Sequence, residues 1–128
     1  MRTMLLAVAA AAVAATAAAH HSYGATYDLN KSVTLEGKLV QFVYRNPHSF
    51  VTLQAPDPSG TMQRWAVEWS GTGQLGGQGV TRETLRAGDQ ITIVGRPSRV
   101  SGEFRLLMVS LKRPSDGFSW GTRGEVVD

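Results

Sequence analysis

Five short segments with the composition of β-strands are the feature that most limits what this chain can fold into. They are rich in β-branched and aromatic residues, and turn signals containing Gly, Pro or Asn separate them. Gly37 in the first segment predicts a β-bulge. Because a small open sheet exposes two edges, we expect an all-β fold, a small five-stranded OB-like Greek-key barrel, with a small β-sandwich as the alternative. The expected strands are residues 33–44, 48–55, 61–70, 90–97 and 104–111.

A glycine-rich stretch separates the third and fourth expected strands. Residues 71–79 hold five glycines, and we expect a flexible connection there. Residues 81–85 begin with a Thr whose hydroxyl can cap a helix, so they predict one short helical turn. Residues 71–76 also match the G-x-G-x-x-G pattern of dinucleotide sites. We do not expect such a site, because the pattern needs a helix at its last glycine and the glycines continue through position 79.

The first 19 residues have the pattern of a secretory signal peptide. Arg2 provides the positive charge, residues 4–15 are apolar, and Ala17 and Ala19 form an A-x-A cleavage site. The apolar run is shorter than the roughly 20 residues that span a bilayer, so we expect export to the periplasm and no membrane span in the mature form. We expect four regions, namely a signal peptide (1–19), an N-terminal arm (20–32), the barrel (33–113) and a flexible tail (114–128).

Composition narrows the possible partners and metal ligands. The chain has no cysteine, which excludes disulfides and thiolate metal sites. Its formal net charge is +3, and its Lys and Arg residues are scattered rather than clustered, so we do not expect nucleic acid as a partner. A transition-metal site would have to use His, carboxylate, Met or the terminal amine.

The three histidines of the chain, His20, His21 and His48, are the candidate metal ligands. Cleavage after Ala19 would make His20 the first residue, so that its amine and imidazole could chelate one ion. Cleavage one residue earlier would also give an amino-terminal Cu(II) chelate. Pro47 would fix the backbone direction of His48 at the barrel rim. We expect copper, with zinc or no metal as alternatives, and weaker binding in acid because a bound imidazole must be deprotonated.

Glu68 and Asn46 are the residues that we expect to support these ligands. Strand alternation places Glu68 on the face opposite the core. The ordinary interpretation is a solvated carboxylate paired with Arg64 or Arg45. The alternative is an acceptor that orients a metal-bound imidazole. The residues expected to point into the core on the same strand are Trp65, Val67 and Trp69.

Several motifs together resemble a bacterial exported family catalogued as domain of unknown function 6152. The resemblance covers about residues 20–113 and implies a small periplasmic β-barrel, and the family name gives no activity. The chain departs from the common form at Tyr23, where Phe is usual, and in its glycine-rich stretch. The matching motifs are His20-His21-Ser22-Tyr23, Thr34-Leu35-Glu36-Gly37, Asn46-Pro47-His48, Trp65-Ala66-Val67-Glu68, Gly79-Val80-Thr81-Arg82 and Leu85-Arg86-Ala87-Gly88-Asp89.

These observations favour a non-enzymatic protein that carries or buffers a metal ion, working with an envelope protein or a metal-transport partner. The alternative is an OB-type module that binds an envelope glycan, peptide or partner protein without metal. Its expected ligand face consists of Phe42, Tyr44, Arg45 and Phe50. A copper-dependent oxidase is a third interpretation, because N-terminal His chelation also occurs in copper monooxygenases. The sequence carries no Ser-His-Asp, paired-carboxylate or H-E-x-x-H arrangement, so an enzyme would have to use the metal itself.

Overall fold

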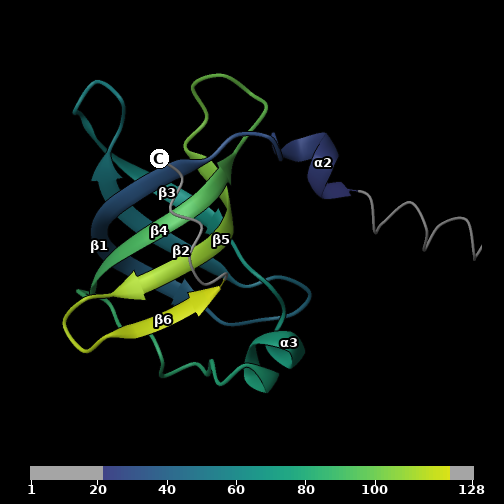
Figure 1. The fold of residues 1–128 in the computed structure, drawn as a ribbon, viewed down its shortest axis with the longest axis vertical. Coiled ribbons are helices and arrows are strands. Elements are labelled where there is room, and N and C mark those ends of the chain that lie inside the picture. Colours follow the sequence, from purple (N-terminus) through teal and green to yellow (C-terminus); the bar gives the residue numbers. More distant parts are fainter. Residues whose placement is uncertain (1–21, 122–128) are drawn as a thin grey trace, which may run out of the picture.

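The structure, a computed structural model, describes residues 22–121 (Figure 1). Signal peptide cleavage and the two histidines at positions 20 and 21 therefore lie outside the described residues. Six strands and two short helices follow one another along this part of the chain. They are α2 (Ser22–Thr26), β1 (Val33–Val43), β2 (Phe50–Pro56), β3 (Met62–Glu68), α3 (Thr72–Gly77), β4 (Gln90–Pro97), β5 (Arg105–Arg113) and β6 (Phe118–Gly121).

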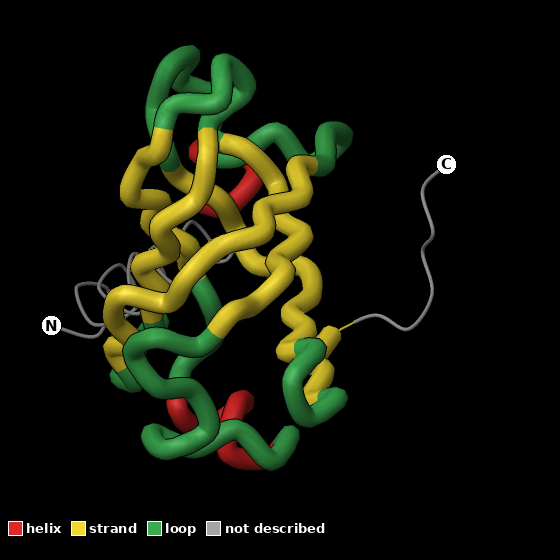
Figure 2. Tube along the Cα trace, turned by 90° about the vertical axis from the view of Figure 1, so that its left-hand side faces the viewer, coloured by secondary structure: helices red, strands yellow, loops and turns green. Residues whose placement is uncertain are grey.

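The strands form one sheet that closes on itself. Their order is β3-β2-β1-β4-β5-β6, and each neighbouring pair is antiparallel. An additional parallel pairing between β3 and β5 closes the first five strands into a barrel, and β6 extends β5 outside it. Figure 2 shows the strongly curved strands that form the barrel. The expected all-β class and the five barrel strands are confirmed, while the OB-like Greek-key label stays a prediction.

Strand β1 pairs with two different strands, and a glycine lies where a neighbouring strand approaches it closely. The first half of β1 pairs with β4 and the second half with β2. A Cβ at Gly37 would overlap the carbonyl oxygen of Gln54 and lie 2.9 Å from the Cβ of Ala55. The expected bulge at Gly37 is wrong, because this residue pairs regularly with Ile91 and the register shift lies between Leu39 and residue 41.

The helix between the third and fourth strands lies earlier than we expect. Residues 81–85 form turns, and the helix α3 occupies the glycine-rich stretch. Leu75 explains this position, because its side chain is fully buried in the core and its amide donates to the carbonyl of Gly71. A helix does occupy the dinucleotide pattern, but it begins at Thr72 and ends at Gly77, so, as we expect, no helix opens at the last glycine, Gly76. The pattern still lacks its parallel βαβ unit, because β3 and β4 are not neighbours in the sheet.

The barrel interior is filled by alternate residues of each strand. Trp65, Val67 and Trp69 all point into this core, as the alternation predicts. Fully buried aliphatic side chains from the other four barrel strands surround them, including Leu39, Leu53, Ile93, Leu106 and Leu111.

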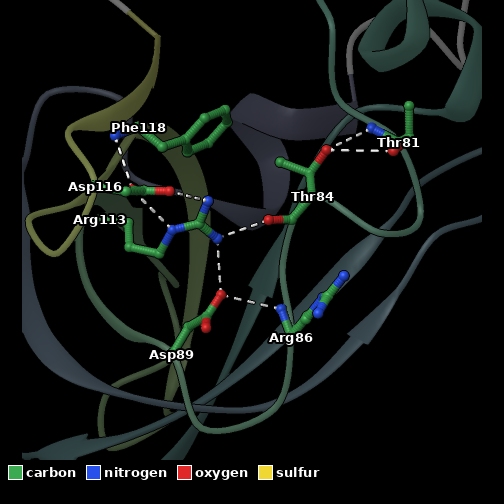
Figure 3. A network of polar contacts seen from close by, with 7 residues as sticks. All are labelled: Thr81, Thr84, Arg86, Asp89, Arg113, Asp116 and Phe118. Carbon is green, nitrogen blue, oxygen red and sulfur yellow. Dashed lines mark hydrogen bonds and ion pairs between the residues drawn. The ribbon is translucent and has the colours of Figure 1, made fainter.

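The segment after β5 belongs to the sheet rather than to a tail. We expect a flexible tail from residue 114, yet residues 118–121 form β6. The guanidinium of Arg113 anchors this hairpin, because it contacts Asp89 Oδ2 and Asp116 Oδ2 at 2.8 Å each and donates to the Thr84 carbonyl at 2.7 Å (Figure 3). The Trp120 ring lies 5.0 Å from that of Trp69, which seals this end of the core.

Candidate functional site

The arm that contains α2 is fixed on the outside of the barrel, beside the β4–β5 connection (Figure 1). Arg99 donates from its backbone amide to the Thr26 carbonyl at 2.9 Å and from Nε to the Gly24 carbonyl at 2.7 Å. The Asp28 amide donates to the Pro97 carbonyl at 2.8 Å. These bonds hold the arm against β4 and β5, so the tyrosines of the arm face the seam where β3 meets β5.

A buried polar cluster lies under this arm. Tyr27 is fully buried, and its hydroxyl donates to Glu68 Oε2 at 3.1 Å and accepts from Arg105 Nε at 2.8 Å. Arg105 Nη2 lies 3.3 Å from Glu68 Oε1. Burial, together with the Glu68 carboxylate, raises the pKa of Tyr27 to about 12. The three side chains thus form a closed ring of polar contacts.

The expectation of a solvated Glu68 is wrong. Its exposed fraction is 8%, and its cationic partner is Arg105 rather than Arg64 or Arg45. The β3–β5 register aligns Glu68 with Leu107, two residues beyond Arg105, so both charged side chains leave the sheet on its outer face. The arm covers Glu68 on this outer face, which explains why the carboxylate is buried.

His48 lies at the edge of the cluster. Its Nδ1 is 3.5 Å from Glu68 Oε1, and the Tyr23 hydroxyl lies 3.2 Å from Nδ1 and 3.3 Å from Nε2. Burial and the nearby Glu68 carboxylate raise the pKa of Tyr23. The imidazole is about one-third exposed, at 34%, so a solute can reach it. The contact between Glu68 and an imidazole is the arrangement that our alternative interpretation of Glu68 requires.

Two surface hollows meet at His48. Each has a volume of about 330 Å³, and both are also lined by Pro47. One extends past Tyr23 to Gln74, and the other lies between Arg45 and Glu68. His48 therefore borders enough space for a hydrated ion or a small organic ligand.

A family model described as a family of unknown function (DUF6152) matches residues 7–105. The chain belongs to this family. The match includes every residue of the cluster, from Tyr23 through His48 and Glu68 to Arg105, which is its last residue. No curated protein and no solved structure matches the chain. The family description names no activity, so the function must be inferred from the cluster itself.

The other residues that we expect to hold or support a metal ion have different positions or roles in this DUF6152 member. Within residues 22–121 there is no group of three or more His, Cys, Asp or Glu side chains that could hold a metal ion. His48 is the one candidate histidine in this range. Asn46 supports a helix rather than the imidazole, because its Oδ1 accepts from the Thr72 amide at the start of α3 at 2.8 Å.

The structure divides the expected ligand face into two pairs. Phe42 aligns with the fully buried Val51 and contacts Trp69 with ring centroids 5.7 Å apart, so it points inward. Tyr44 donates to the carbonyls of Thr72 and Val80 and closes the barrel end. Arg45 and Phe50 lie together on the other side, with the guanidinium 5.4 Å from the ring centroid. Of the four residues of the expected ligand face, only Arg45 and Phe50 line the hollow between Arg45 and Glu68.

Sequence reasoning missed Tyr23, Tyr27 and Arg105. The two tyrosines are four residues apart, which places them on one face of a helical turn, and this spacing was the available signal. No local pattern distinguishes Arg105 from the other scattered arginines, because its partners are 78 and 37 residues away in the sequence. Within the described part of the chain, no helix is long and apolar enough to cross a membrane.

Proposed function

We propose that the protein binds a transition metal, with copper as the preferred ion, through His48 and the nitrogens of His20 or His21 after removal of residues 1–19. Its role would be to carry or buffer the ion in the periplasm. The observation that carries the proposal is the contact between Tyr23 and His48 at 3.2 Å. The arm that follows the two histidines directly is thereby held against the third.

Covalent geometry supports bringing these nitrogens together. Residue 20 is three peptide units from Tyr23, and consecutive Cα atoms are 3.8 Å apart, so their Cα atoms are separated by about 11 Å at most. Tyr23 itself contacts the imidazole of His48. The chain is therefore long enough for a terminal amine or imidazole to reach an ion bound at His48.

The chemistry of the donors also fits. Imidazole and amine nitrogens suit Cu(II) and Zn(II), and an imidazole that contacts a carboxylate is a common metal-site arrangement. Glu68 can be that carboxylate, because Tyr27 and Arg105 hold its two oxygens in place. The chain has no cysteine, so no thiolate competes with the nitrogen ligands for the metal ion.

The test is a Cu(II) titration of protein isolated from cells that produce it, with its N-terminus read by mass spectrometry. We expect one equivalent of Cu(II) to bind, and His48→Ala to abolish it. A matched variant, Gln74→Ala, removes a polar side chain from the same hollow and should bind normally. Equal affinity of His48→Ala and the wild type, or a natural N-terminus beyond residue 21, would refute the proposal.

A second candidate, a metal-free binding module for an envelope glycan, peptide or partner protein, is favoured by the hollow between Arg45 and Glu68. The Arg45 guanidinium over the Phe50 ring offers a planar cation and an apolar edge for such a ligand. Chemical-shift mapping with envelope saccharides and peptides, in the presence of a chelator, tests it. Shifts that surround Phe50 and disappear in Arg45→Gln would support this function over the first.

A further inference from the structure

We propose that Tyr27 is a positioning residue that, with Arg105, fixes the orientation of the Glu68 carboxylate. His48 then carries its proton on Nδ1, and the lone pair of Nε2 is available to bind a metal ion. This inference deepens the proposed function by naming the nitrogen that would bind the metal. It concerns the metal-free protein, so it can be tested separately.

The direction of the Tyr27 hydroxyl proton follows from its two partners. Arg105 Nε can only donate, so at 2.8 Å the Tyr27 oxygen must accept from it. The Tyr27 proton then points to its other contact, Glu68 Oε2, at 3.1 Å. Because Tyr27 is fully buried, water does not compete for this proton.

Because Oε2 accepts from Tyr27, the other carboxylate oxygen, Oε1, is left to contact the remaining partners. Glu68 Oε1 faces Arg105 Nη2 at 3.3 Å and His48 Nδ1 at 3.5 Å. The ring of contacts opposes rotation of the carboxylate, since rotation would leave the buried Tyr27 hydroxyl without its acceptor and would break the ion pair with Arg105.

A carboxylate oxygen accepts hydrogen bonds, and a neutral imidazole has one N–H and one lone pair. The nitrogen that faces Glu68 Oε1 is therefore the one that holds the proton, and Nε2 holds the lone pair. The Tyr23 hydroxyl is 3.2 Å from Nδ1 and 3.3 Å from Nε2, and with the proton on Nδ1 only the Nε2 lone pair can accept its proton in the metal-free protein. An arriving metal ion would replace this proton donor at Nε2.

The experiment reads the ring ¹⁵N chemical shifts of His48 in the full chain without metal, with the signals assigned by their loss in His48→Gln. In the wild type we expect a protonated Nδ1 and an unprotonated Nε2, seen as two widely separated shifts. In Tyr27→Phe the two shifts should converge, because the carboxylate is free to turn. Tyr44→Phe is the matched control, since its hydroxyl bonds two backbone carbonyls elsewhere, and it should keep the wild-type shifts.

Glu68→Gln provides a second variant that keeps the side-chain shape if Tyr27→Phe fails to fold. Its shifts should also converge or exchange, because an amide can present a donor to Nδ1. Copper affinity should fall at least tenfold in Tyr27→Phe, the usual effect of losing a partner behind a metal ligand. Wild-type shifts in Tyr27→Phe, or in Glu68→Gln where the first variant is unfolded, would overturn the inference. Converged shifts together with unaltered copper binding by His48→Ala would refute the metal proposal alone.

Discussion

Removing the guanidinium of Arg105 should cost much more stability than removing an exposed cation. Arg105→Met keeps the length of the side chain but removes the bond to Tyr27 at 2.8 Å and the ion pair with Glu68 at 3.3 Å. A hydrogen bond to a charged group contributes about 1.5–3 kcal/mol, and a neutral one about 1 kcal/mol. The Arg105 side chain is 34% exposed, so water offsets part of the loss. We expect the free energy of unfolding to fall by about 2–3 kcal/mol.

Equilibrium unfolding in urea, followed by the fluorescence of the buried tryptophans, measures this loss. Lys31→Met is the control, because Lys31 is 72% exposed and lies 3.7 Å from Asp28, and its removal should cost less than about 0.5 kcal/mol. In the Glu68→Gln background, Arg105→Met should lower the free energy of unfolding by about 1–2 kcal/mol less than it does in the wild type. The reason is that the glutamine in this background carries no charge that would be left buried without a partner. Equal losses for the Arg105 and Lys31 variants would show that the cluster is not energetically coupled.

Three further changes test other parts of the structure. Gly37→Ala should destabilise the protein by at least about 2 kcal/mol in thermal unfolding, because the new Cβ would overlap the Gln54 carbonyl oxygen, whereas Gly73→Ala in α3 meets nothing within 4 Å and should be neutral or stabilising by up to about 1 kcal/mol. The pKa of Tyr27, raised from about 10 to about 12, means that the unfolded chain loses this proton first, so stability should fall by about 2–3 kcal/mol between pH 10 and 12, and Tyr27→Phe should lack that part of the slope in alkaline denaturation curves. Asn46→Ala removes the side-chain acceptor at the start of α3 and should cost about 1 kcal/mol in urea unfolding, with faster amide exchange in α3 as the local signature.

The positions of the five barrel strands along the chain, and the faces of their residues, could be predicted from the sequence because they depend on near neighbours. Alternation along residues 62–69 correctly assigned Trp65 and Val67 to the core, since side chains of a strand leave the sheet on alternate sides. The position of His48 beside an Asn-Pro turn and its contact with Glu68 also follow from adjacent strands, because β2 and β3 pair directly. The family resemblance, carried by motifs spread over residues 20–89, is confirmed.

The sequence alone could not decide where the short elements lie. The glycine-rich stretch becomes a helix because Leu75 finds a place in the core, and burial of one leucine offsets the poor helix propensity of glycine. Phe118 and its neighbours form β6 because Arg113 connects their hairpin to the loop of Asp89. Both outcomes depend on contacts with parts of the chain that no local pattern includes.

What the sequence determined is which residues face outward from the sheet, and Glu68 is one of them. Only the tertiary structure decided that this outward-facing side chain is buried. Closure of β3 against β5 brings Arg105 to Glu68, and the arm places Tyr27, which is 41 residues from Glu68 and 78 from Arg105 in the sequence, in contact with both. The physical reason is that the pleat of a strand fixes the direction of a side chain, whereas the cover above that side chain depends on distant segments that meet only when the barrel closes.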